Sequence, residues 1–388
     1  MPDQRPAAAP LYDERFEHDA CGVGFVADAG GHSADRVLGL ALAGLASLGH
    51  RGAFAADGES SDGAGVALPL EKAIVGRLTA GVAGVAGFAR VAGDLAAGRE
   101  RTIRSGDLGV VSLFLSPDPR TQARERRIVE RALATEGLSR PAWRDVPVRR
   151  SALGQLAAGS MPSVAQVLVG RPPAITSAAF ELALICARRR IEVKARATAR
   201  RTRVDRFLSV TSASARSIVY KGLVAGGHLA DLFPDLELPL PTSYAVFHQR
   251  YATNTTPTWR LAQPFSLIAH NGEINTVRGN REQVRGRSED LAGPAGRRLL
   301  AAGPLLSPDG SDSLSLDEAI EALMAMGRGL EWTVRNLIPA AAETQPDGRH
   351  QHGVLEASPL LAPWDGPAAI VFGDGRRVGA VVDRKSVV

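Results

Sequence analysis

The chain has 388 residues, of which 45% are hydrophobic and 22% charged, and its formal net charge at pH 7 is +5. This length and composition predict an ordinary globular protein with one large or two medium domains. No stretch approaches the roughly 18 uninterrupted apolar residues that a membrane-spanning helix needs, so we expect no membrane association.

The basic balance of the chain raises the question of a nucleic-acid partner. The sequence pI is about 9.6, and the densest cationic run, residues 187–206, has few apolar positions at helical spacing. This run therefore predicts a solvated, basic helix. Because no aromatic residues are interleaved with its arginines for base stacking, we expect no nucleic-acid partner.

The cysteines and the N-terminal residues bear on the compartment. The chain has two cysteines, Cys21 and Cys186, which are far apart and do not make a disulfide framework. The first twenty residues are acidic and lack the apolar stretch of a secretory signal. We therefore expect a cytoplasmic protein.

The hydrophobic pattern predicts many strands and a few helices. Apolar residues at three- and four-residue spacing predict helices, and short β-branched runs bounded by Gly or Pro predict strands. The predicted strands are 21–28, 64–70, 108–115, 164–170, 207–214, 216–224, 243–253, 265–276 and a hairpin over 368–383; the helices are 35–50, 121–137 and 313–329. Together they predict an α+β domain in which helices cover sheets. Ser313 or Ser315 is expected to cap the last helix, and Gly373 to Gly375 to form the hairpin turn.

Cys21 directly precedes the first predicted strand, and two interpretations are open. A free cysteine is most often a small buried core residue. If residues 1–20 were removed, however, Cys21 would carry an α-amino group with a pKa of roughly 7.7 to 8.0, able to accept the thiol proton near neutral pH. The thiol would then be a nucleophile that carries its own base.

Four further stretches each have a structural and a functional interpretation. Arg51, in HRG, is either a surface cation before a helix-capping glycine or part of a site, and Asp62 suits a tight loop close to one. Arg250, at a strand end, is either solvated or paired two-pronged with a substrate carboxylate. Asn271 and Gly272 form either a turn or a pair of oxyanion-hole donors. Asp312 is either a helix N-cap or a carboxylate that holds a substrate ammonium.

The ordered segments DACGVGF, HRG, HQRYATNT, AHNGEINTVRGNR and GSDS resemble the glutaminase domain of glutamate synthase large subunits, a class II glutamine amidotransferase of the N-terminal-nucleophile hydrolase type. WRDVPV, QVLV, RSIVYKGLV, FPDL, NLIPA and PWDGPAAI also resemble that family in order, so the resemblance covers nearly all of 17–384. It implies a four-layer αββα sandwich, and hydrolysis of L-glutamine to glutamate and ammonia through a γ-glutamyl thioester.

The resemblance also implies a role for each singled-out residue. Residues 1–20 would be a propeptide and 21–388 the amidotransferase domain. Cys21 would be the nucleophile, Asn271 and Gly272 would hold the oxyanion, and no metal ligand is expected. Arg51 would line the nucleophile's site, Arg250 would bind the glutamine α-carboxylate and Asp312 the α-ammonium. A site that pairs both charges should reject substrates that lack either one.

Two departures from the family pattern are visible. Gln263 stands in RLAQPF where the family's usual AHPF leads us to expect histidine. The chain also leaves the pattern at its end, GAVVDRKSVV, where the family continues into a central domain, an FMN-binding barrel with an iron–sulfur cluster, and a β-helix domain. We therefore expect a C-terminally truncated piece that itself needs no cofactor. The full enzyme would use FMN and an iron–sulfur cluster, with a small electron-transfer subunit or ferredoxin as its partner.

Two alternatives remain open. The first is the glutaminase domain of another amidotransferase, such as those that make phosphoribosylamine or glucosamine phosphate. The long segment between Arg51 and Arg250 and the EINTVRGNR run count against it. The second is a non-catalytic module that binds glutamine without processing of the leader.

Overall fold

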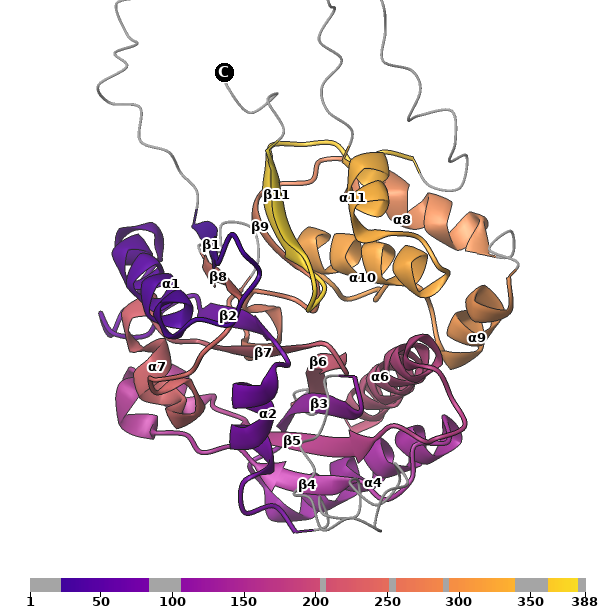
Figure 1. Ribbon diagram of the computed structural model, residues 1–388, viewed down its shortest axis with the longest axis horizontal. Helices are drawn as coiled ribbons and strands as arrows, with labels where there is room; N and C mark the ends of the chain where they lie inside the picture. The colour runs from indigo at the N-terminus through magenta and orange to yellow at the C-terminus, as the bar shows by residue number, and fades with distance from the viewer. Residues whose placement is uncertain are drawn as a thin grey trace, which may run out of the picture.

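The computed structural model describes residues 22–83, 106–202, 207–250, 256–288, 293–338 and 362–382 (Figure 1). Its helices are α1 (Asp35–Ser47), α2 (Lys72–Thr79), α4 (Pro119–Thr135), α5 (Gln155–Gly159), α6 (Ser177–Thr202), α7 (Leu229–Leu232), α8 (Val277–Gly286), α9 (Pro294–Ala302), α10 (Asp312–Ala325) and α11 (Leu330–Leu337). Short 3-10 turns occupy Leu48–Arg51, Arg150–Ala152, Gly226–His228, Pro234–Leu236 and Trp259–Leu261. No helix in these ranges is both long and apolar enough to span a bilayer.

The strands form three antiparallel groups. The first has the order β1 (Val23–Ala27), β8 (Tyr244–Gln249), β2 (Ala64–Pro69), β7 (Ser217–Gly222), and the second β4 (Ala142–Asp145), β5 (Ser163–Gly170), β3 (Leu108–Leu115), β6 (Ser209–Ser214). The third has the order β11 (Val378–Val382), β10 (Ala368–Gly373), β9 (Ile268–Gly272). Mixed helices and antiparallel sheets confirm the expected α+β class.

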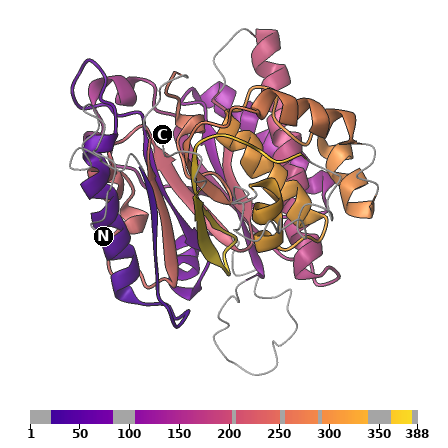
Figure 2. The ribbon, with the colours of Figure 1, turned by 90° about the horizontal axis from the view of Figure 1, so that it is seen from above.

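Buried apolar side chains fill the space between these helices and sheets. One cluster joins the inner face of α1 to the first sheet, and a second joins α4 and α6 to the strands of the second sheet. A third packs α10 and α11 against β9 and β10. A small fourth cluster, Tyr244, Val246, Ala269 and Val371, lies between β8 and the β9–β10 pair. Seen from above, α1 and the orange helices of the C-terminal part lie on opposite sides of the strands (Figure 2).

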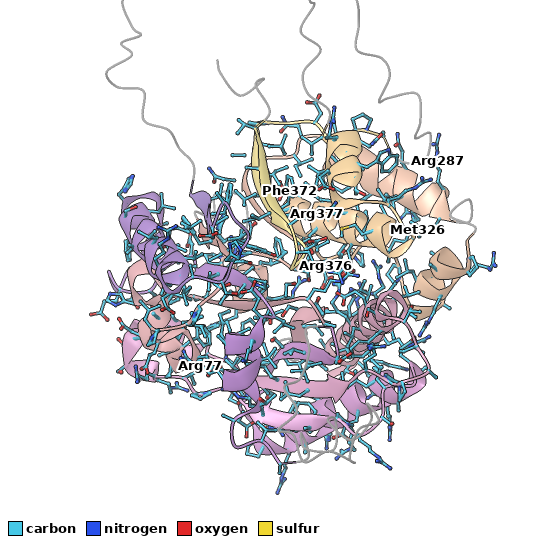
Figure 3. All side chains as sticks on the ribbon, viewed as in Figure 1. Arg77, Arg287, Met326, Phe372, Arg376 and Arg377 are labelled. Carbon is cyan, nitrogen blue, oxygen red and sulfur yellow. The ribbon has the colours of Figure 1, made fainter. Side chains whose placement is uncertain are left out.

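Every strand and helix expected from the hydrophobic pattern has a counterpart, with corrections at the ends. The β10–β11 connection is longer than expected: Gly373 still pairs with Val378, so Asp374 to Arg377 make the turn. Arg376 and Arg377 mark this end of the hairpin (Figure 3), where Arg377 pairs with Glu331 of α11 at 2.6 Å.

The prediction for the cap of α10 was wrong. Neither Ser313 nor Ser315 is the N-cap: the Ser311 side chain accepts the Leu314 N–H at 3.1 Å, and Asp312 is the first helical residue. The carboxylate of Asp312 is thereby left available for contacts outside the helix.

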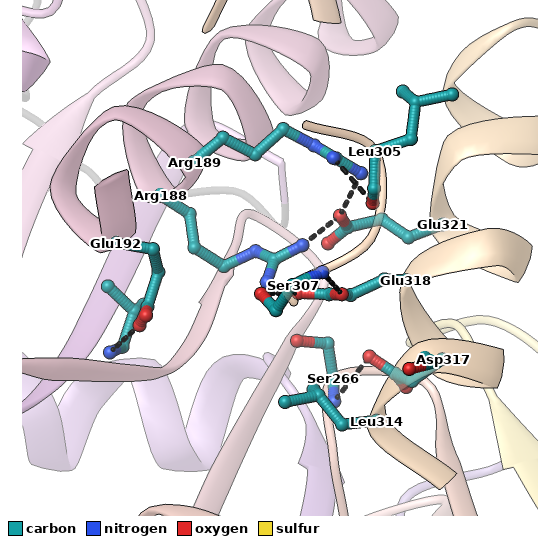
Figure 4. Close-up of polar contacts among 12 residues, drawn as sticks. Arg188, Arg189, Glu192, Ser266, Leu305, Ser307, Leu314, Asp317, Glu318 and Glu321 are labelled. Atoms are coloured by element: carbon teal, nitrogen blue, oxygen red, sulfur yellow. Dashed lines mark hydrogen bonds and ion pairs between the residues drawn. The ribbon is translucent and has the colours of Figure 1, made fainter. Parts of the chain in front are cut away.

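The prediction of a solvated basic helix was wrong for the inner face of α6. Arg188 and Arg189 are buried and pair with Glu321 of α10, while Glu318 accepts from the N–H and hydroxyl of Ser307 (Figure 4). Burial of these guanidinium groups is possible because each meets a carboxylate or backbone carbonyl. The network therefore anchors α10, whose first residue is Asp312, to the longest helix of the described chain.

Candidate active site

Strand β1 and Gly22, the first described residue of the chain, are hydrogen-bonded to β8 and to Gln249 at its end. Val23 stands opposite His248, and Gly22 accepts the Gln249 N–H at 2.7 Å. A Cβ on Gly22 would lie 2.3 Å from the Gln249 carbonyl oxygen, so this close approach requires glycine. Cys21 lies outside the described residues, but its peptide bond to Gly22 limits the Cα–Cα distance to about 3.8 Å. The nucleophile predicted from the sequence is therefore covalently attached to this point of the sheet.

Gln249, for which no role was predicted from the sequence, holds three segments at that point. Its Oε1 accepts the Gly226 N–H at 2.7 Å, and its Nε2 donates to Ser61 Oγ at 3.1 Å. A Cβ on Gly52 would lie 2.5 Å from Gln249 Nε2. Gly52 has a φ of −92°, so it is needed for this approach and not for a left-handed helix cap. In the sequence, Gln249 is only a polar residue at the end of the run YAVFH, and this position alone does not predict its contacts.

Arg250 follows β8 directly, as predicted, and is buried. Its N–H donates to the Gly63 carbonyl at 2.8 Å, which fixes the backbone at the strand end. Burial lowers the pKa of its guanidinium, whereas the carboxylates of Asp62 and Asp312 act in the opposite direction. Arg250 and Asp312, which are 62 positions apart in the chain, therefore share one electrostatic neighbourhood.

Asn271 and Gly272 end β9 and do not form the two-residue hairpin turn that their sequence also allowed. They pair with Ala369 and Ala368 of β10. Ala269 belongs to the apolar cluster that faces β8, and side chains alternate along a strand. The Asn271 side chain therefore lies on the face of β9 turned toward β8, the neighbour of β1.

Two features of the backbone at residue 272 require glycine: its φ angle and its close contact with Pro367. Its φ is +128°, a conformation that residues with a Cβ rarely adopt. A Cβ there would also lie 1.9 Å from the Pro367 carbonyl oxygen. The backbone at the end of β9 is therefore built for glycine alone.

Helix α10 holds both ends of β9 through carboxylates. Asp312 Oδ2 accepts the Ile274 N–H at 3.0 Å, just beyond the strand. Asp317 Oδ1 accepts the N–H groups of Leu267 and Ile268 at 2.8 and 3.0 Å, at its beginning. The segment that carries Asn271 and Gly272 is thus positioned by one helix.

The family model described as "Glutamine amidotransferases class-II" matches residues 21–387. The chain belongs to this family. It is 35% identical over 386 residues to the NADPH glutamate synthase large chain of Azospirillum brasilense, covering 98% of this chain and 24% of that protein. It is 35% identical over 379 residues to ferredoxin-dependent glutamate synthase 2 of Synechocystis sp., covering 96% and 23%, and 32% identical over 390 residues to the NADPH large chain of Bacillus subtilis, covering 99% and 24%.

The chain spans about a quarter of the length of these curated relatives. Among the site residues inferred for the amidotransferase, the described structure contains Arg250, Asn271, Gly272 and Asp312, and it brings them to adjoining ends of β8, β9 and α10. Arg51 ends a 3-10 turn after α1, but its side chain, like Cys21, lies outside the described part.

A buried lysine lies beside the predicted substrate pocket of the amidotransferase. Lys221, on β7, donates to the Arg260 carbonyl at 3.2 Å and lies 4.7 Å from the centre of the Phe265 ring. Burial lowers its pKa to about 7, while the Asp317 carboxylate acts against the shift and the Arg260 and Arg250 guanidinium groups add to it. Lys221 therefore loses its proton near neutral pH in the folded protein.

Lys221→Met is expected to change how stability depends on pH. An unfolded lysine keeps its proton up to a pKa of about 10.4, so between pH 7 and 10 the unfolded wild-type chain binds more protons and the contribution of Lys221 to stability rises with pH. The slope of this contribution is at most about 1.4 kcal/mol per pH unit. Urea unfolding of both proteins at pH 6, 7, 8.5 and 9.5 tests this prediction. The stability of the variant minus that of the wild type should fall as the pH rises above 7. A difference in stability that does not change with pH would contradict a lowered Lys221 pKa.

The chain has too few cysteines to ligate an iron–sulfur cluster by itself. In the described ranges, no three His, Cys, Asp or Glu side chains converge as metal ligands. Cluster ligation takes about four thiolates, but the sequence has two cysteines, and Cys186 is buried in α6. The residues present do not fit such a group.

Proposed function

We propose that this chain hydrolyses L-glutamine to glutamate and ammonia through a γ-glutamyl thioester on Cys21, after removal of residues 1–20. The observation that carries the proposal is the meeting of Arg250, Asp312 and the Asn271–Gly272 end of β9 beside the start of β1, to which Cys21 is bonded. The family match that begins at residue 21 supports the same boundary.

The charged end of glutamine is bound by two opposite charges. Arg250 presents a planar fork of donors that pairs two-pronged with the α-carboxylate. Asp312 presents a carboxylate to the α-ammonium; its oxygens are oriented by the N–H groups of Ile274 and Ser313 at 3.0 and 2.7 Å. Because Arg250 is buried and Asp312 is partly buried, a ligand that lacks the matching charge for either group is disfavoured.

The oxyanion donors are aimed by the strand pairing of β9. The His270 N–H points away from β10, because it donates to Gln263 at 2.9 Å. In an antiparallel ladder this direction alternates from residue to residue, so the N–H of Gly272 is turned to the same edge. With the Asn271 amide, it supplies two donors for the carbonyl oxygen that becomes negative when the thiolate attacks.

The chemical cycle uses the α-amine of Cys21 as its only base. The amine takes the thiol proton, Sγ attacks the amide carbon, and the C–N bond breaks as the resulting ammonium returns a proton to the leaving ammonia. Water, deprotonated by the same amine, then attacks the thioester; the C–S bond breaks, glutamate leaves, and the ammonium returns the proton to Sγ to restore the thiol. Arg51 lines the nucleophile's side of this site.

The fold proposed for the domain is a four-layer αββα sandwich, in which β1 is an end strand of its described sheet and lies next to β8. Domain limits of 1–20 for the leader and 21–388 for the amidotransferase go with it. Helices on both sides of the strands and the apolar cluster between β8 and β9 support this arrangement.

The wider role proposed is ammonia supply for glutamate synthesis from glutamine and 2-oxoglutarate. It rests on relatives named glutamate synthase, whose printed names include NADPH and ferredoxin. An iron–sulfur cluster would belong to regions outside this sequence, because two cysteines are too few to ligate it, and the resemblance implies FMN in the same regions. The partners of this chain are then L-glutamine, the synthase domains and an electron-transfer subunit or ferredoxin.

The proposal is tested on the chain that begins at Cys21, confirmed by intact mass and N-terminal sequencing. We expect glutamate and ammonia from L-glutamine, with at least a hundredfold lower kcat/KM for glutaramate, which lacks the α-ammonium. Binding of glutamine without turnover would instead support a non-catalytic module. Turnover that requires a sugar phosphate would support the glutaminase domain of another amidotransferase.

Arg250→Lys is expected to raise the KM for glutamine by roughly 10- to 100-fold with a smaller change in kcat, because the two-pronged contact to the α-carboxylate is lost. Steady-state kinetics measure both constants. Arg260→Lys is the matched control, since Arg260 pairs with Asp309 and lies outside the proposed pocket. An unchanged KM for Arg250→Lys would contradict the assignment of Arg250.

A further inference from the structure

The outer edge of β9 is completed by a side chain. β9 is the last strand of its group, with β10 on one side only. On the other side, the His270 N–H donates to Gln263 Oε1 at 2.9 Å, and Gln263 Nε2 donates to the His270 carbonyl oxygen at 2.9 Å. The amide of Gln263 thus supplies the donor and the acceptor that a neighbouring strand would supply.

Gln263 is itself held firmly in place. The residue is 7% exposed, and its carbonyl oxygen lies against β2, where a Cβ on Gly65 would approach it to 2.6 Å. A glycine in β2 therefore makes room for the backbone of Gln263. The side chain that pairs with His270 is consequently fixed to the sheet that carries β1 and β8.

The His270 carbonyl oxygen has a second contact, to a side chain of β8. His248 Nε2 lies 3.0 Å from the His270 carbonyl oxygen, which can only accept, so this nitrogen carries the proton. Burial lowers the pKa of His248 to about 3, so the ring is neutral at working pH. His248 stands opposite Val23, two residues after Cys21, and this bond therefore connects the nucleophile's strand pair to β9.

We propose that Gln263 is a positioning residue for the proposed glutamine hydrolysis, acting on the two oxyanion donors through His270. By fixing both backbone groups of His270, it sets the direction of the next two residues, Asn271 and Gly272. This inference rests on the proposed function. It adds to that function a residue that acts through the backbone of His270.

The expected kinetic signature follows from what oxyanion donors do. They act where charge develops, so displacing them lowers kcat more than it weakens binding of the ground state. The groups that hold glutamine also have anchors outside β9: the Arg250 N–H donates to Gly63, and Asp312 is part of α10, where it accepts the Ser313 N–H in addition to that of Ile274. Loss of the Gln263 contacts should therefore leave KM nearly unchanged.

The test uses Gln263→Met, which keeps the length of the side chain but makes neither hydrogen bond. We expect kcat to fall roughly 10- to 100-fold, as a misplacement of about 1 Å can cause, with KM within about threefold. Alkylation of Cys21 by iodoacetamide, a displacement that develops no oxyanion, should keep its wild-type rate. Gln263→His, whose ring can make one of the two bonds, should recover part of kcat.

Gln166→Leu is the matched control. Gln166 is another buried glutamine, on β5, where it accepts from Arg144 at 2.8 Å, and β5 belongs to a different sheet from β9. It should lose stability without loss of kcat. Wild-type kcat in Gln263→Met, or a fall in kcat with an equal slowing of alkylation, would overturn the proposal. Absence of turnover in the wild-type chain that begins at Cys21 would instead overturn the proposed function.

Discussion

Cys21→Ala, in a chain that begins at residue 21, is expected to lose glutamine hydrolysis by on the order of 10⁴- to 10⁶-fold. The variant keeps the α-amine and the groups that bind glutamine but has no thiol to form the thioester. Glutamate release, measured with excess enzyme, gives the residual rate. Binding of glutamine, measured by calorimetry, should remain within a few-fold of the wild type.

The control for this variant is the second cysteine. Cys186 lies inside α6, with its Sγ 3.8 Å from the Arg298 carbonyl oxygen, and burial raises the pKa of its thiol to about 11. Almost no thiolate forms there at neutral pH. Cys186→Ser should retain turnover, and an electrophilic glutamine analogue should label the wild type once, at Cys21. Label at Cys186, or turnover by Cys21→Ala, would contradict the nucleophile assignment.

The same chain with residues 1–20 still attached provides a second comparison. Its residue 21 has an amide nitrogen in place of an amine, and an amide does not accept a proton near neutral pH. We expect turnover at least a hundredfold below that of the chain that begins at Cys21, since general-base catalysis is typically worth 10² to 10⁴. Equal rates would show that the α-amine is not the base.

Most strands of this fold were predictable because they are short apolar runs with clear ends; β4 was not predicted, because only two of its four residues, AWRD, are apolar. β3, for example, is buried at all eight positions and is written as one continuous apolar segment broken only by Gly109 and Ser112. Helices α2, α5, α7, α8, α9 and α11 were not predicted. α8 buries only Asn280 and Val284, which is too weak a periodicity to see without its tertiary partners.

Buried charges were invisible for a different reason. Arg188 reads as part of a cationic surface because its partner, Glu321, lies 133 positions away. Asp317 reads as an ordinary helix residue, yet it is fully buried and burial raises the pKa of its carboxyl to about 7. Such residues are recognised only when the fold brings their partners together.

In the candidate site, too, some residues could be predicted from the local sequence and others could not. Arg250, Asn271 and Asp312 were singled out because each stands in a motif with a chemical meaning. Gln249 and Gln263 were not assigned a role, although both make several contacts around the site, because a buried amide has no distinctive spacing. The residues that touch the substrate are thus easier to predict than the residues that position them.

Gly272→Ala is expected to reduce glutamine hydrolysis by roughly 10²- to 10³-fold, the cost of losing an oxyanion donor. Its new Cβ would lie 1.9 Å from the Pro367 carbonyl oxygen, and its φ of +128° is disfavoured for alanine. The end of β9 must therefore move, and the strain alone should lower stability by about 1–3 kcal/mol. Kinetics and urea unfolding, run at the same temperature, separate the two effects.

Gly31→Ala is the matched control for backbone strain. Gly31 also has a positive φ, +70°, but a Cβ there meets nothing within 4 Å, and the residue is exposed at the far end of β1. It should lose stability and keep wild-type kcat. If Gly272→Ala retained kcat while losing stability, the N–H of residue 272 would not be an oxyanion donor, and the Asn271 amide would have to stabilise the developing charge without it.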